Sequence, residues 1–367
     1  NAAGTGTVTD ANGNFSLACQ NGTSVSISFV GYETLRQSIK NCDQFLVIAL
    51  DPLPGYLQNI EITASSIQNK SLLYQPASLT RLQERELKRG NGLFLDDAIN
   101  GNVPGVTMQR RTVSGGQQFN IRGYGNGTRG TNGISSNFDG QGYKVYLNGI
   151  PLTDAEGITQ MDDIDFASIG DVDVLKGPAG TLYGLAIAGA VNLHLREPEK
   201  GKTSIGQELM LGSYGLRRYN THFEMGGEHG SLLLNYGYQH SDGFMLHTAS
   251  TKKFFNAAGQ FQVNDKESLF FYAAHSNSYD ERGGELTLDQ YASFDYSGNP
   301  AYIKRNAHSE IISFRGGIGH TYQFSSKFSN TSILFGSGAS TNASSAAGWT
   351  DKDPVNYGFR TIFSGKF

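Results

Sequence analysis

Residues 143–152 read YKVYLNGIPL and residues 171–193 read DVDVLKGPAGTLYGLAIAGAVNL, and the architecture of the chain can be worked out from these two stretches. Each contains a short run of alternating apolar residues, over residues 144–147 and 171–175, and such runs predict strands. An Asn-Gly pair follows the first run and a Gly-Pro pair follows the second. Because these dipeptides mark turns, both strands are expected to end there.

Between the second turn and the end of this region lies a segment dense in small residues. Residues 181–189 contain glycine, alanine, leucine and one tyrosine, which suits close backbone approach better than a free-standing helix. The segment is therefore expected to lie inside a larger enclosure that other parts of the chain supply.

The composition favours β-structure. Of the 367 residues, 38% are hydrophobic and only 17% are charged, while the chain contains 47 Gly, 18 Tyr and 22 Phe. Low charge with many glycines and aromatics is typical of strands with one apolar and one wet face. The formal net charge of -4 argues against nucleic-acid binding, which needs a basic surface. No apolar run reaches the roughly 18 residues of a transmembrane helix.

Residues 1–53 are predicted to form a small β-module with strands near residues 15–17, 24–30 and 45–50. The segments GTVTDANGNFSL, VSISFVGYET and FLVIAL are similar to the later part of the carboxypeptidase-regulatory-like domain that precedes many outer-membrane receptors of Bacteroidetes-type bacteria. The resemblance implies a β-sandwich that is N-terminally truncated here, without peptidase activity. Cys19 and Cys42, the only cysteines, either form a disulfide in an oxidising compartment or remain two buried thiols.

Residues 74–198 are predicted to form an α+β domain. We expect helices over residues 79–87 and 94–100, and strands over residues 106–110, 118–122, 144–147, 171–175 and 190–195. Along this region the chain carries DDAINGNVPGVTMQ, FNIRGYGNG, YKVYLNGIPL, IGDVDVLKGPAGTLYG and AGAVNLHLREP. Their order and type resemble the plug domain of TonB-dependent outer-membrane receptors, and the resemblance implies a plug inside a membrane β-barrel.

Residues 54–73 are predicted to be a linker that contains the β-prone octet LQNIEITA. An unpaired short strand at a domain edge can add to the sheet of another protein. By the resemblance, the octet lies where these receptors carry the TonB box, which binds the energy-transducing TonB-type partner. The residues of this TonB-box-like segment are Asn59, Ile60, Glu61, Ile62, Thr63 and Ala64. Internal pairing of the same strand is the alternative.

Residues 199–367 alternate apolar and polar residues in segments of roughly 10, which is typical of outer-membrane strands. Strands are expected to begin near Thr203, Arg217, Ser231, Lys253, Glu267, Ser309, Phe328 and Asn356. Tight turns are expected at residues 226–230, 264–266 and 325–327, and long connections at residues 277–308 and 339–355. Plugged transporters have about 22 strands. These roughly eight strands are therefore expected to be the first part of a barrel that continues beyond Phe367.

Two basic side chains are predicted to fasten the plug. The guanidinium of Arg122, on a plug strand in a polar lumen, can hold barrel carboxylates bidentately, and Lys176 precedes a plug turn. The alternative for Arg122 is an ordinary surface ion pair, which contributes less than about 1 kcal/mol.

By the resemblance, the outer apices of the plug would face the ligand. The candidate ligand-facing residues are Arg110, Arg111, Arg129, Asn137, Asp139, Asp154 and Glu156. Arg110 and Arg111 would suit an anionic chelate, while each residue could equally be only solvated.

Enzymatic motifs are weak. A Gly-x-Gly-x-x-Gly pattern starts at Gly125, but no helix is predicted after it to cradle a phosphate. His194 with Glu197, and His222 with Glu224, lack the third ligand of a zinc site, and the second pair is expected to face the lumen. We therefore expect no enzyme activity, no catalytic residue, no metal site and no cofactor.

Together these patterns predict a mainly β protein with a small N-terminal β-sandwich module, an α+β plug domain and the first part of a large antiparallel transmembrane β-barrel. The resemblance implies TonB-dependent import of a scarce, bulky ligand, with a ferric siderophore or another iron chelate favoured. It places the protein in the outer membrane of a Gram-negative bacterium, with the N-terminal module in the periplasm. The alternative is a receptor-like structural subunit of an outer-membrane protein assembly without transport activity.

Overall fold

The computed structural model describes residues 6–10, 13–17, 24–28, 34–39, 46–50, 78–89, 94–110, 115–125, 142–155, 157–178, 183–184 and 186–365. The chain divides into two compact units, residues 1–59 and residues 60–367. Among the described residues no helix is long and apolar enough to cross a membrane.

In the first unit, β1 (Ser24–Ile27) pairs antiparallel with β2 (Leu35–Ser38). The strand predicted at residues 24–30 is confirmed over its first half, whereas β2 was not predicted. Residues 46–50 are not part of a strand, so the prediction of a strand there is wrong. No described residue pairs with them, and a strand exists only through its ladder partner. Cys19 and Cys42 lie outside the described residues.

The second unit begins with the plug segment, which we define as residues 78–198. Its helical elements are α1 (Glu84–Leu87), α2 (Leu95–Asn102) and the 3₁₀ turn η2 (Phe166–Ser168). Its strands are β3 (Ser78–Leu82), β4 (Val106–Gln109), β5 (Gln118–Ile121), β6 (Tyr124–Gly125), β7 (Tyr143–Leu147), β8 (Ile150–Pro151), β9 (Ile169–Lys176) and β10 (Gly189–Leu195). They form one sheet in the order β3-β9-β10-β7-β8 and a second in the order β4-β5-β6.

Residues 143–147, 171–176 and 189–193 form the centre of the first plug sheet. β7 runs parallel to β10, and β10 runs antiparallel to β9. Val145, Val174 and Val191 on these strands are completely buried. Gly189 has φ +151° and stands so close to the backbone of β9 that a Cβ would collide with the Leu175 carbonyl oxygen. The predicted need for close backbone approach is therefore real at this position.

The helix predicted over residues 79–87 is wrong in its first half. There the chain forms β3, because residues 78–82 pair antiparallel with β9, with Leu79 opposite Leu175. Pairing to a buried neighbour overrides the local helical spacing. The short helix α1 begins only after Gln83, whose backbone N–H donates to the Glu86 carboxylate at 3.2 Å in a capping box. The helix predicted over residues 94–100 is confirmed as α2.

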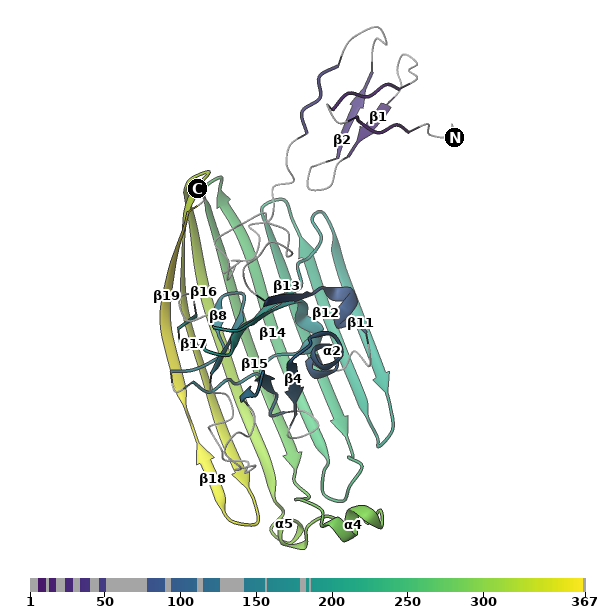
Figure 1. The fold of residues 1–367 in the computed structure, drawn as a ribbon, viewed down its shortest axis with the longest axis vertical. Helices are drawn as coiled ribbons and strands as arrows, with labels where there is room; N and C mark the ends of the chain where they lie inside the picture. The colour runs from purple at the N-terminus through teal and green to yellow at the C-terminus, as the bar shows by residue number, and fades with distance from the viewer. Residues whose placement is uncertain are drawn as a thin grey trace. The chain divides into compact units, whose positions relative to one another are not determined.

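The remaining strands form one nine-stranded sheet, called here the barrel sheet. Its strands are β11 (Thr203–Leu211), β12 (Arg217–Gly226), β13 (Gly230–Ser241), β14 (Ser250–Asn264), β15 (Glu267–Glu281), β16 (His308–Ser325), β17 (Phe328–Ser344), β18 (Trp349–Lys352) and β19 (Val355–Gly365). All neighbouring strands pair antiparallel. β18 and β19 both pair with β17. Figure 1 shows these long strands side by side, with plug elements such as α2 and β4 drawn in front of them.

The connections of the barrel sheet fit the predictions with one exception. The turns around residues 227–229, 265–266 and 326–327 are tight, and residues 282–307 form a long connection with α4 (Leu288–Ala292) and α5 (Pro300–Lys304). The long connection predicted at residues 339–355 is wrong, since β17 and β18 continue the ladder up to a turn at residues 345–348. The break between β18 and β19 falls at Pro354, which has no N–H to donate.

The polarity of the barrel sheet is inverted relative to a soluble protein. Phe359 is 66% exposed and Ile318 is 62% exposed on its outer face, whereas Asn235 and Gln239 are 1% exposed on its inner face. Aromatic contacts lie at both ends of the outer surface: Phe324 with Phe328 beside one turn, and His308 with Trp349 at the opposite end. An apolar band between aromatic girdles is the pattern of a membrane β-barrel.

Candidate functional site

One plug loop binds the barrel sheet through two ion pairs. This clasp loop, residues 161–168, carries Asp163 and Asp165. Nη2 of Arg218, on β12, donates to both carboxylate oxygens of Asp165 at 2.7 and 2.8 Å. Nε of Arg315, on β16, donates to Asp163 Oδ2 at 2.6 Å. All four side chains are nearly inaccessible to water, with exposed fractions between 2% and 6%.

The two arginines differ in how firmly they hold the plug. Arg315 also donates to the carbonyl oxygens of Pro151 at 3.3 Å and Gln160 at 3.2 Å, so it joins the clasp loop to the β7–β8 hairpin. Arg218 instead uses its second amino group on its own sheet, donating to Gln239 Oε1 at 3.2 Å. Arg315 is therefore bound to three plug positions and Arg218 to one.

The local structure of the clasp loop sets the direction of its carboxylates. Asp165 caps η2, since its Oδ1 accepts from the Ala167 N–H at 2.9 Å and its carbonyl accepts from the Ser168 N–H at 3.1 Å. The Gly116 N–H donates to Asp162 Oδ1 at 2.8 Å, which ties the loop to the segment before β5. A capped turn with fixed ends presents Asp163 and Asp165 in a defined geometry.

A third barrel arginine reaches the plug from β19. Arg360 Nη1 donates to the Gly149 carbonyl at 3.3 Å, and its guanidinium lies 4.6 Å from the centre of the Tyr146 ring. On the other side of the barrel sheet, Arg196 of the plug lies 3.7 Å from Glu224 on β12. Glu224 therefore faces the plug, as predicted for the His222 and Glu224 side of this strand.

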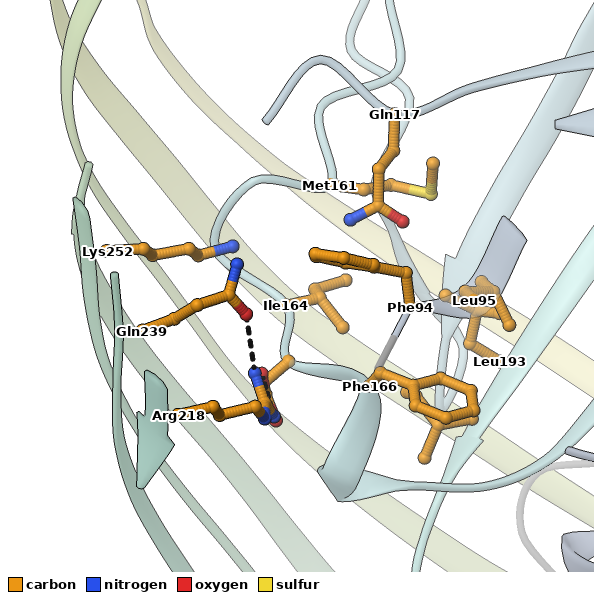
Figure 2. Close-up of a pocket in the computed structure, with 12 residues that line it drawn as sticks. Phe94, Leu95, Gln117, Met161, Ile164, Phe166, Leu193, Arg218, Gln239 and Lys252 are labelled. Carbon is orange, nitrogen blue, oxygen red and sulfur yellow. Dashed lines mark hydrogen bonds and ion pairs between the residues drawn. The ribbon is translucent and has the colours of Figure 1, made fainter. Parts of the chain in front are cut away.

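A small cavity lies between the clasp loop and β12–β14 (Figure 2). Its volume is about 20 Å³, which is enough for one water molecule. Apolar plug side chains such as Ile164 and Phe166 form one side, and Arg218, Gln239 and Lys252 form the other. The cavity is too small for a bulky ligand, so the described structure is a closed one at this contact.

A second cluster of charges lies within the plug sheet. Asp171, Asp173 and His194 bring potential metal-binding atoms within 4.8 Å of one another. These atoms already have partners, because His194 Nδ1 lies 2.7 Å from Asp171 Oδ1 and Arg81 forms two 2.6 Å contacts with Asp173. Burial lowers the pKa of His194, but the hydrogen bond and charge of Asp171, with the charge of Asp173, outweigh it and raise the pKa above its ordinary value of 6.5. The cluster therefore functions as a network of ion pairs.

The structure brings the two predicted fastening residues together inside the plug. Lys176 Nζ donates to the Pro104 carbonyl at 3.2 Å, and the Arg122 backbone N–H donates to the Gly105 carbonyl at 3.0 Å, so both hold the same turn. Burial and the charge of Arg122 lower the pKa of Lys176. Among the described residues, Arg122 forms no ion pair with a barrel carboxylate. Its role in fastening the plug to the barrel stays a prediction.

Two of the predicted ligand-facing residues fall in described parts of the plug. Arg110 Nε donates to Asp96 at 2.8 Å, and its guanidinium lies 3.6 Å from the centre of the Phe94 ring. Asp154 Oδ1 accepts from the Ile158 N–H at 2.8 Å and stabilises a turn. The remaining predicted site residues lie outside the described residues: Asn59, Ile60, Glu61, Ile62, Thr63, Ala64, Arg111, Arg129, Asn137, Asp139 and Glu156.

Sequence reasoning missed the clasp loop and its arginines. Period-two alternation along residues 312–324 assigns Arg315 to the polar face of its strand. An arginine pointing into a barrel lumen is costly unless it has an anionic partner. A search for inward arginines, followed by a search for plug carboxylates, would have found Asp163 and Asp165 as candidates. It would not have told which carboxylate pairs with which arginine.

The fold and its contacts define a class of protein: a plug held by ion pairs against the inner face of a membrane-type β-barrel sheet. Residues 71–191 match the family model described as TonB-dependent Receptor Plug Domain. Two curated relatives agree with this match. The TonB-dependent receptor SusC of Bacteroides thetaiotaomicron is 27% identical over 45% of this chain, and the vitamin B12 transporter BtuB of Vibrio vulnificus is 25% identical over 66%.

Solved structures share the fold. The siderophore receptor PiuA from Acinetobacter baumannii superposes with a TM-score of 0.61 and 14% identity, covering 81% of this chain and 43% of its own. This chain spans only 17% of the length of SusC and 36% of that of BtuB. The findings support a TonB-dependent receptor of the outer membrane, with a plug domain packed on a sheet of membrane-barrel type.

Proposed function

We propose that the protein imports a scarce, bulky ligand across the outer membrane with energy from a TonB-type partner. The observation that carries this proposal is the clasp loop, whose side chains hold the plug against the barrel sheet through a few buried ion pairs. Such a plug closes the lumen at rest, and ion pairs can be broken and formed again in each cycle. Among the similar proteins, BtuB is a vitamin B12 transporter and PiuA a siderophore receptor.

The proposal assigns a role to each part of the chain. Residues 1–53 form a periplasmic module, and residues 54–73 a linker whose segment from Asn59 to Ala64 pairs with the TonB-type partner. Residues 74–198 form the plug, and residues 199–367 the first barrel strands. Candidate ligand-facing residues lie at the plug apices, and a ferric siderophore or other iron chelate is the proposed ligand class. No enzymatic step is part of the proposal.

Interrupting the TonB-box-like strand tests the energised step. Ile60→Pro removes a backbone donor and blocks strand addition, whereas the matched control Ile60→Val preserves it. We expect the proline variant of the full-length protein to reach the outer membrane normally. Iron-starved cells that carry it should no longer accumulate any member of a panel of radioactive ferric chelates. The valine variant should retain this accumulation. Full uptake with the proline variant would contradict energised import through this segment. Absence of uptake by the unsubstituted protein would instead favour the structural subunit without transport activity.

The ligand class is tested separately by binding. Detergent-purified full-length protein should bind at least one ferric chelate in calorimetry, and the same chelator without iron should bind more weakly. Binding of cobalamin but of no iron chelate would leave TonB-dependent import in place and change its ligand.

A further inference from the structure

The inner face of β12 and its neighbours carries polar side chains that the closed structure leaves without partners. Along β12, the residues that face the plug are Arg218, Asn220, His222 and Glu224. On β13 and β14, Asn235 and Asn256 lie opposite each other, and Asn235 also lies opposite His222. We call Asn220, Asn235 and Asn256 the asparagine wall.

The asparagine wall is buried, and two of its three side chains are unsatisfied. Its side chains are between 1% and 3% exposed. Within the described part of the chain, the side-chain amides of Asn220 and Asn235 have no hydrogen-bond partner, and Asn256 interacts with the Tyr272 hydroxyl. Buried polar groups without partners are unfavourable, so their presence on the wall calls for an explanation. An amide offers both a donor and an acceptor without net charge.

The opposite part of the barrel sheet contacts the plug through apolar groups. On β16, Gly317 packs directly against Ile150 of the plug, and an added Cβ would lie 2.5 Å from the Ile150 Cδ1. Tyr272, Ala274 and Ile333 belong to the same hydrophobic cluster as the plug core. Leu233 on β13 belongs to this cluster too, and Ala258 on β14 packs against it, so apolar contact with the plug extends to that side. The asparagine wall adds buried amide groups to the contact on β12–β14.

The ion pairs are distributed unevenly between the two sides. Arg315 on β16 is bound to three plug positions, whereas the β12 side is held at one end by Arg218 with Asp165 and at the other by Glu224 with Arg196, 3.7 Å apart. From residue 218 to residue 224 a strand extends about 20 Å. One ion pair thus lies at each of the two ends of the asparagine wall.

We propose that, on energisation, the plug separates from β12–β14 while Arg315 keeps its other side in place, and that the ligand passes along the asparagine wall. This rests on the proposed import function. The ligand class that the wall fits is one with a surface rich in hydroxyl and amide groups and little charge. Arg218 with Asp165 is the latch at one end of this path, and Arg315 with Asp163 is the anchor.

Cysteine labelling tests the path without knowledge of the ligand. Full-length protein with Cys19→Ser and Cys42→Ser receives either Asn235→Cys on the wall or the control Ser313→Cys, which is 7% exposed on the anchored side. Cells are treated with a sulfonated methanethiosulfonate reagent, with and without a protonophore. We expect energisation to raise the labelling rate of Asn235→Cys about tenfold and to leave that of Ser313→Cys unchanged, since the rate follows the open population. Asn220→Cys serves as a second wall position.

The outcomes of the labelling experiment distinguish the proposed path from the proposed import function. Energy-dependent labelling of Ser313→Cys alone, or equally of both positions, overturns the path while leaving energised import intact. No energy dependence at any position also overturns the path, and the uptake assay with Ile60→Pro then decides separately whether energised import stands. In de-energised cells, Asp165→Asn should raise labelling at residue 235 more than Asp163→Asn does, and the reverse order overturns the assignment of latch and anchor.

Discussion

Asp163 and Asp165 are separated by one residue, yet they bind arginines on strands with three others between them. An isolated buried charge is strongly unfavourable, so each pair is worth most when both partners are present. The sequence allowed the inward position of Arg315 to be predicted, because period-two alternation assigns every residue to a face. It did not allow its partner to be predicted, because the loop that carries Asp163 has no periodicity.

Neutralising one carboxylate of the clasp loop should loosen the plug. Asp163→Asn leaves the Arg315 guanidinium buried without its counter-charge, and such a change costs about 3–5 kcal/mol. Thermal unfolding of the full-length protein in detergent, with limited proteolysis of the plug, measures the effect. Glu199→Gln is the control, since Glu199 pairs with Lys202 at the surface, with exposed fractions of 69% and 66%. That variant should change stability by less than about 1 kcal/mol, and equal effects would contradict the role of the clasp loop.

His194 should make plug stability depend on pH. Its pKa is raised in the folded state, so the proton it holds contributes stability that is fully present below the ordinary pKa of 6.5 and is lost as pH rises through the folded pKa. Melting temperatures of the full-length protein should therefore fall as pH rises above 6.5, and His194→Asn should flatten this part of the profile. His229→Asn, in an exposed turn, should leave the slope unchanged. An unaltered slope in His194→Asn would disprove the assignment.

At the level of elements, the barrel strands could be predicted well because their two faces lie in different environments. Lipid on one face and the polar plug contact on the other impose alternation along every strand, and the predicted starts lie close to those of β11 to β17 and β19. The wrong predictions concern segments whose conformation is set by the strand with which they pair. β3 takes its conformation from β9, and β18 continues the ladder of β17 through residues with no clear alternation.

The contact between β16 and the plug hairpin gives an element-scale prediction. Gly317→Ala places a methyl group against Ile150, and overpacking of this kind costs about 1–3 kcal/mol. Ile150→Val in the same protein should recover part of the lost melting temperature, because it removes the methyl that collides. Gly316→Ala on the outer face, where a Cβ meets its nearest atom at 3.6 Å, should have little effect. If the two alanine variants melt alike, the plug does not pack on β16 as described.

At the scale of the whole molecule, the resemblance of five motifs to a known plug domain predicted the domain organisation better than the properties of single residues could. Composition and alternation indicated membrane strands, and the small-residue segment before Gly189 indicated an enclosure. The orientation of the plug against the barrel sheet depends on pairs such as Arg218 with Asp165, which join residues 53 positions apart. Pairs that are distant in sequence leave no local pattern, so they appear only in three dimensions.

The clasp loop also constrains the order in which the protein folds. Asp163 and Arg315 are 152 residues apart in the chain, with β11 to β15 between them. Closing so long a loop before the intervening strands are formed carries a large entropic cost. The plug sheet can form from local pairings, but its final seating has to wait until β16 is in place. Barrel assembly and plug docking are thus expected to finish as one late step, with the barrel strands completed around a plug that is already nearly folded.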